Sequence, residues 1–104
     1  MLATLMDLID NPEEKRKFEQ LFINYQQTMY HTAYRILKNQ HDAEDAVQQA
    51  FIRVIDHLSD VDENDVGKTR SYLAIIARNM AFDVYRKKKR EMTHTISYDE
   101  HEMF

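Results

Sequence analysis

The chain has 104 residues, which suits one domain with one modest core; its single Gly and single Pro argue against β-hairpins, and its lack of Cys excludes disulfides and thiolate metal sites. Its formal net charge of −4 hides an asymmetry, because residues 1–67 hold 6 Lys or Arg against 13 Asp or Glu, residues 68–90 hold 8 against 1, and residues 91–104 hold none against 4. A basic segment in an acidic chain predicts one surface for a polyanion and another surface for a different partner.

The first predicted element is a short amphipathic helix at the start of the chain. Its apolar residues recur at helical spacing: Leu2, Leu5, Met6 and Ile9. This stretch lacks a preceding basic region, carries Asp7 and is too short to span a membrane. We therefore expect a soluble, cytoplasmic protein that does not bind membranes.

The first long helix is predicted to begin at Pro12 and to end near Lys38. Asn11 can accept hydrogen bonds from the backbone as N-cap, and Pro12 suits the first helical position because its missing N–H has no partner to lose there. Glu14 completes a capping box. The apolar stripe consists of Phe18, Leu21, Phe22, Tyr25, Met29, Ala33, Ile36 and Leu37.

The second long helix is predicted to begin at Asp42, since carboxylates in its first turn favour the positive end of the helix dipole. Its apolar face consists of Ala43, Ala46, Val47, Ala50, Phe51, Val54, Ile55 and Leu58. The opposite face carries a mixed strip, Asp45, Gln48, Gln49 and Ile52. This strip is either solvated or suited to docking a partner helix.

An acidic loop over residues 59–68 leads to the third long helix, predicted from Thr69 to about Arg90. Its core row is Leu73, Ile76, Ala77, Met80 and Val84, and a second row interleaves aromatic and basic groups: Ser71, Ile75, Arg78, Phe82, Tyr85 and Lys89. Residues 91–104 are acidic, lack periodicity and are expected to form a flexible tail. The elements together predict an all-α fold, a compact bundle of three main helices with a short N-terminal helix.

Five consecutive basic residues, Arg86 to Arg90, end the third helix. One or two cations would complement the helix C-terminus, but five place like charges at i,i+3 and i,i+4, where each pair opposes the helix by about 0.2–0.5 kcal/mol. A polyanion would relieve this repulsion, whereas a solvated helix end is the alternative. Phe82 and Tyr85 either stack on unpaired bases or pack in the core.

No motif points to catalysis, so we expect that the protein is not an enzyme and uses no cofactor. The chain lacks a Gly-rich phosphate loop and a nucleophile motif. The residues from Glu91 to His94 match the Glu-x-x-His spacing of di-iron bundles, but such sites need two of these motifs and further Glu ligands. A metal site is therefore not expected.

Two motifs resemble the second conserved region of bacterial RNA polymerase sigma factors of the extracytoplasmic-function group. The first runs from Asp42 to Val54, Asp-Ala-Glu-Asp-Ala-Val-Gln-Gln-Ala-Phe-Ile-Arg-Val. The second runs from Thr69 to Arg86, Thr-Arg-Ser-Tyr-Leu-Ala-Ile-Ile-Ala-Arg-Asn-Met-Ala-Phe-Asp-Val-Tyr-Arg, and is followed by the basic run usual in that family. The resemblance covers roughly residues 15–90.

The resemblance implies two partners. One is core RNA polymerase, whose largest subunit would bind through its clamp helices to Asp42, Glu44, Asp45, Gln48, Gln49, Ile52 and Arg53. The other is the minus-ten promoter element, whose non-template single strand would be recognised and melted by Lys68, Thr69, Arg70, Ser71, Arg78, Asn79, Arg86, Lys87, Lys89 and Arg90. Residues 60–71 would accept a flipped base, Asn79 would face that pocket, and the basic run would hold phosphates.

The chain departs from the family pattern in three respects. Tyr72 stands where many relatives have Trp, and Gln49 where many have Glu or Asp. The family's second helical domain, which reads the minus-thirty-five element, does not follow. Residues 1–90 are therefore expected to be the region 2 domain and residues 91–104 an acidic linker or tail, in a fragment of a longer protein rather than a natural one-domain protein.

Other partners and other functions stay open. The family commonly has an anti-sigma factor, which is a further expected partner. The alternatives from other classes are a helical protein-binding adaptor with a solvated basic run and a carboxylate-rich metalloenzyme. The sequence does not indicate the promoter sequence or the inducing signal.

Overall fold

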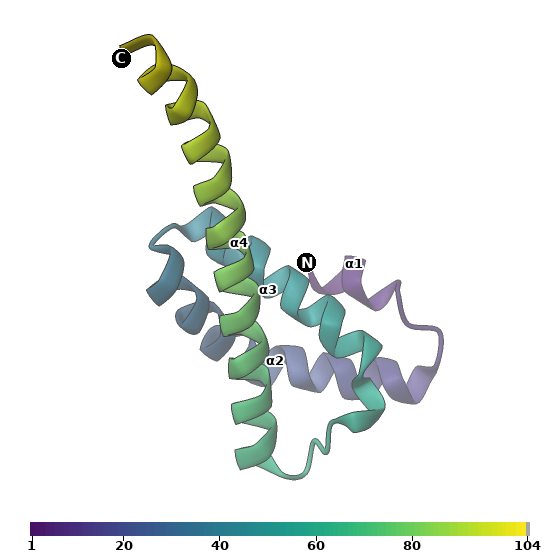
Figure 1. Ribbon diagram of the computed structural model, residues 1–104. Helices are drawn as coiled ribbons and strands as arrows, with labels where there is room; N and C mark the ends of the chain where they lie inside the picture. Colours follow the sequence, from purple (N-terminus) through teal and green to yellow (C-terminus); the bar gives the residue numbers. More distant parts are fainter. Residues whose placement is uncertain (104) are drawn as a thin grey trace.

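The computed structural model describes the backbone of residues 1–103 and the side chains of residues 1–92. It consists of α1 (Leu2–Met6), α2 (Pro12–Leu37), α3 (Gln40–Asp56), a 3₁₀ turn η1 (Leu58–Asp60) and α4 (Val66–Met103) (Figure 1). The described residues contain no strand. This architecture confirms the predicted all-α bundle of three main helices with a short N-terminal helix.

Helix α2 begins as its sequence predicts. The Asn11 side-chain oxygen accepts hydrogen bonds from the Glu13 and Glu14 amides at 2.8 and 3.1 Å, and Pro12 occupies the first helical turn. The helix ends at Lys38, whose backbone is left-handed with φ 55° and whose amide donates to the Tyr34 carbonyl at 2.8 Å. A left-handed residue at this position is a common helix terminator.

Helix α3 begins two residues earlier than predicted. The cap is Asn39, whose side-chain oxygen accepts from the Asp42 amide at 2.9 Å. The predicted start at Asp42 rested on the carboxylates of the first turn, whereas the cap, Asn39, lies three residues earlier.

Both ends of α4 also lie outside the predicted limits. The helix begins at Val66 rather than Thr69, because the Asp65 side chain accepts from the Lys68 amide at 3.1 Å. It continues to Met103, so the repulsion among the basic residues does not end it near Arg90. The role of residues 91–104 as an acidic linker or tail stays a prediction. The side chains from residue 93 onward, including His94 of the Glu-x-x-His spacing, lie outside the described ones.

The core lies where α2, α3 and α4 cross. Phe51 of α3 meets Phe18 edge-on, with ring centroids 5.6 Å apart, and contacts Phe22 at 4.9 Å. Helix α4 contributes buried Leu73, Ile76, Ala77, Met80 and Ala81. Helix α1 and the residues after it close one end through Leu5 and Ile9.

Helix α4 projects beyond the other helices at its C-terminal end, which leaves the basic run near the edge of the bundle (Figure 1). No helix in the described part of the chain is long and apolar enough to cross a membrane. Among the described side chains, no three His, Asp or Glu groups gather as a metal ion would require.

Candidate functional site

A hollow of about 510 Å³ lies where the loop after η1 meets the start of α4. Its volume falls in the range of ligand pockets, about 300–1,000 Å³. It is lined by Asp60, Val61, Asp62, Asp65, Lys68, Thr69 and Tyr72. Thr69 is only 2% exposed, and its hydroxyl donates to the Asp62 carbonyl at 2.7 Å, so this hydrogen bond joins two residues of the lining.

The charges around this hollow favour a base edge over a phosphate. Asp60, Asp62 and Asp65 provide carboxylates, which repel phosphate but accept hydrogen bonds from N–H groups. Lys68 adds one donor, and the half-buried ring of Tyr72 offers an apolar wall. The hollow can therefore hold a flat, polar group that carries N–H donors, as nucleobases do.

The predicted DNA-binding residues divide between this hollow and the exposed side of α4. Lys68 and Thr69 line the hollow. The others are exposed along the helix: Arg70, Ser71, Arg78, Asn79, Arg86, Lys87, Lys89 and Arg90. Asn79 does not line this hollow, and its expected place beside a flipped base stays a prediction.

The position of Asn79 follows from helix geometry. Tyr72, Asn79 and Arg86 are seven residues apart, so they lie on nearly the same face at intervals of about 10 Å. Asn79 thus follows the hollow along α4 and is not part of it. The three residues form a line from the hollow to the basic run.

The aromatic and basic row on α4 is a surface feature. The Arg78 guanidinium lies 5.5 Å from the Phe82 ring centroid, and the Lys89 ammonium lies 5.9 Å from that of Tyr85. Tyr85 is 45% exposed, whereas Phe82 is half-buried. Of the two rings, Tyr85 is the one available for stacking with a ligand.

The basic run contains one residue that faces the bundle. The Lys88 ammonium bonds the carboxylate of Asp42, which is 7% exposed in the first turn of α3. Asp42 was predicted to contact the polymerase, but its side chain is turned toward α4. Arg86 pairs with Asp83 on the same helix, as its spacing predicts.

A second hollow of about 520 Å³ lies beside this pair, between the α2–α3 turn and α4. Its lining is Leu37, Lys38, Asn39, Asp42, Tyr85, Lys88, Lys89 and Met92. Sequence reasoning did not assign Lys38 to any surface. Its proximity to the basic run depends on the tight turn at Asn39, which no local pattern indicated.

The outer face of α3 borders a third hollow of about 390 Å³, shared with α4. Its lining holds three predicted polymerase-binding residues, Gln49, Ile52 and Arg53. The others are Asp56 and His57, for which no contact was predicted, and Met80 of the predicted core row. Glu44 and Asp45 are exposed nearer the start of α3, and Gln48 is half-buried. Glu44 accepts a hydrogen bond from the Gln40 side chain at 3.1 Å.

Comparison with known proteins identifies the family. The family described as Sigma-70 region 2 matches residues 21–91, more than half of the chain. The chain belongs to the sigma-70 region 2 family. The matched part of this region 2 domain includes α3, the loop before α4 and the basic run.

Similar proteins carry the name ECF RNA polymerase sigma factor. The chain is 42% identical to SigW of Bacillus subtilis (strain 168) over 65 residues, which are 62% of this chain and 34% of that protein. It is 31% identical to SigM of the same organism over 75 residues, 72% of this chain and 44% of SigM. For SigE of Mycolicibacterium smegmatis the identity is 34% over 73 residues, 70% of this chain and 27% of SigE.

These relatives confirm the predicted resemblance to region 2 of an extracytoplasmic-function sigma factor. The aligned part of the chain spans less than half the length of each of the three proteins. No solved structure matches the chain.

Proposed function

We propose that this region 2 domain binds core RNA polymerase through α3 and recognises and melts minus-ten promoter DNA through α4 and the loop before it. The role is that of a non-enzymatic initiation factor. The observation that carries the proposal is the acidic hollow at the start of α4, followed along the same helix by exposed Asn79 and the basic run, in a chain of the sigma-70 region 2 family.

The charge distribution assigns different parts of the DNA to different parts of α4. A base enters the hollow beside Tyr72, because the carboxylates there accept N–H donors and repel phosphate. Phosphates are held by the exposed cations of the basic run, Arg86, Lys87, Lys89 and Arg90. Capture of an unpaired base offsets the cost of unstacking it, so binding energy opens the duplex without chemistry.

The distance between these two parts suits a short single strand. Tyr72 and Arg86 are fourteen residues apart, which corresponds to about 21 Å along a helix. At about 3.4 Å per nucleotide of a stacked strand, this length matches about six nucleotides. Asn79 lies midway, where its amide can donate to and accept from the edge of a further base.

The polymerase surface lies on α3. Gln49, Ile52 and Arg53 border one hollow and combine apolar, amide and cationic groups, a mixture that suits the side of a partner helix. Asp42 stabilises the packing of α4 on α3 through Lys88 instead of contacting the partner.

Fluorescence anisotropy with the 104-residue chain and labelled single-stranded oligonucleotides tests the DNA part. With about four phosphates engaged, the logarithm of the association constant should fall with the logarithm of salt concentration at a slope near −3. Lys15, near the start of α2, gives a control variant, since it lines none of the three hollows and Lys15→Ala should leave the slope unchanged. Affinity that does not respond to salt would contradict the proposal and favour a protein-binding adaptor.

A further inference from the structure

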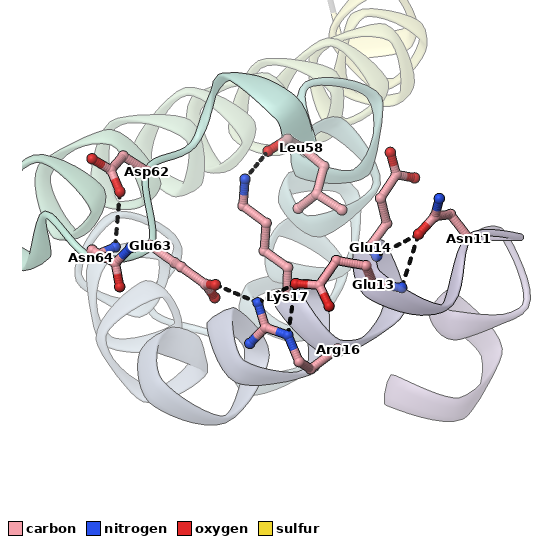
Figure 2. Close-up of polar contacts among 9 residues, drawn as sticks. All are labelled: Asn11, Glu13, Glu14, Arg16, Lys17, Leu58, Asp62, Glu63 and Asn64. Atoms are coloured by element: carbon pink, nitrogen blue, oxygen red, sulfur yellow. Dashed lines mark hydrogen bonds and ion pairs between the residues drawn. The ribbon is translucent and has the colours of Figure 1, made fainter.

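The loop between α3 and α4 is tied to α2 by two neighbouring cations. Arg16 donates from Nη2 to the Glu63 carboxylate at 2.5 Å, and Lys17 donates from Nζ to the Leu58 carbonyl at 2.8 Å (Figure 2). Residues 16 and 17 lie before the segment that the sigma-70 region 2 family matches. We call these two contacts the α2 clamp.

The Arg16 side chain is itself held in place by its own helix. Its Nε and Nη2 both donate to the Glu13 carboxylate, at 2.9 and 2.7 Å, one turn earlier on α2 (Figure 2). The hydrogen bond from Arg16 lowers the pKa of Glu13, and hydrogen bonds to Glu13 and Glu63 raise the pKa of Arg16. The guanidinium therefore stays charged and oriented toward the loop.

The clamp supplies two of the three contacts that anchor the loop around the hollow that we propose to accept a base. Lys17 holds the loop at Leu58, Arg16 holds it at Glu63, and the Thr69 hydroxyl on α4 holds it at the Asp62 carbonyl. Between these anchors lie residues 60–62, all of which line the hollow. The wall of the hollow is thus fixed from α2 on one side and from α4 on the other.

The loop needs external cations because it contains none. Residues 58–65 carry Asp60, Asp62, Glu63 and Asp65 without a single Lys or Arg. Like charges at this density favour an expanded loop, and the two α2 cations offset part of that repulsion. Lys68, the cation in the hollow, then stays available for a ligand.

From this geometry we propose that Arg16 and Lys17 are positioning residues for base specificity, which hold the loop in its base-accepting conformation before DNA binds. The inference rests on the proposed function. A preordered loop avoids an ordering cost that would otherwise be subtracted from the binding of every base, and it keeps the carboxylates at fixed distances from a base edge. An exposed ion pair adds little to global stability, so this role differs from simple stabilisation.

Paired variants of the 104-residue chain test the clamp. Arg16→Gln and Glu63→Gln remove the ion pair with the loop, and Glu14→Gln is the matched control, since it neutralises an exposed carboxylate in the first turn of α2 that forms no ion pair with Arg16. The assay measures affinities for single-stranded oligonucleotides that differ at one base, for each position in turn. At the position that discriminates most in the wild type, the ratio of best to worst affinity should fall at least threefold in the two clamp variants.

Four further results are expected. Glu14→Gln should keep the wild-type ratio, the double variant Arg16→Gln/Glu63→Gln should lose no more than either single variant, and melting temperatures should stay similar. Hydrogen exchange of the amides of residues 59–65 should accelerate in the clamp variants only.

The outcomes separate the clamp from the function on which it rests. If the wild type discriminates among bases and both clamp variants discriminate equally well, the positioning role is wrong and the proposed function stands. If the wild type binds all bases alike, the proposed function fails and the clamp's role fails with it. Faster exchange without a change in base preference would likewise overturn the proposal.

Discussion

The contact between Lys88 and Asp42 predicts that two neighbouring residues of the basic run, Lys87 and Lys88, contribute differently to the stability of the domain. Lys88→Met should destabilise the domain, whereas Lys87→Met, one residue earlier and exposed, should not. The Asp42 side chain is 11% exposed and that of Lys88 is 52% exposed, so the pair lies between the surface and buried cases. Removing one partner costs about 0–1 kcal/mol at the surface and about 3–5 kcal/mol in the interior, which places this loss at about 1–2 kcal/mol.

Local effects do not reverse this estimate. Lys88 has no like-charged neighbour three or four residues away within the run, so its removal relieves no repulsion there. Lys87 has Arg90 at i+3, and its removal should therefore change stability by less than about 0.5 kcal/mol. The positive end of the α3 dipole partly compensates the Asp42 charge, so the expected loss of stability in Lys88→Met stays below the value for a fully buried ion pair.

Urea denaturation followed by circular dichroism measures the stability difference, and thermal melting should show a decrease of about 5–10 °C for Lys88→Met. The DNA assay should show the reverse order: Lys87→Met should reduce the salt slope by about 0.7, and Lys88→Met should reduce it less, because Asp42 already balances that charge. Equal stabilities together with equal salt slopes for the two variants would refute the assignment of Lys88 to the bundle.

Four other predictions concern separate parts of the domain. Asn79→Ala should reduce discrimination among bases more than overall affinity in the anisotropy assay, and at a different position from the one read by the hollow. Arg86→Ala with Arg90→Ala should weaken binding to all sequences alike and flatten the salt slope by about 1.4. Gln49→Ala should reduce binding to core polymerase in a pull-down and leave DNA affinity unchanged. Phe51→Ala should cost about 3–5 kcal/mol by denaturation, because its ring is fully buried among other aromatic rings.

The helices were predictable because their signals are local. Asn11 and Pro12 mark the start of α2, and the apolar rows mark which side of each helix is buried. The predicted starts of α3 and α4 lie too late in the chain, because Asn39 and Asp65 accept hydrogen bonds from amides of the first turn before the predicted first residues, Asp42 and Thr69. The apolar pattern does not decide between these starts, because it is compatible with either.

The site was predictable only where it follows one helix. The exposed residues of α4 follow from its periodicity, whereas the hollow depends on how a loop packs between two helices. Arg16 and Glu63 are 47 residues apart, and Lys88 and Asp42 are 46 apart, so no local pattern brings either pair together. Family resemblance predicts Asn79 beside a flipped base, which stays a prediction, and helix rise places Asn79 about 10 Å farther along α4 than Tyr72 of the hollow.

In the proposed function, the hollow reads a base while the basic run holds phosphates. Nuclear magnetic resonance of the isotopically labelled 104-residue chain, titrated with single-stranded oligonucleotides that differ at one base, tests this assignment. We predict that amide shifts of residues 60–72 change with the identity of the base, while those of residues 86–90 change equally for all sequences. Shifts confined to the basic run for every oligonucleotide, with residues 60–72 unaffected, would contradict the claim.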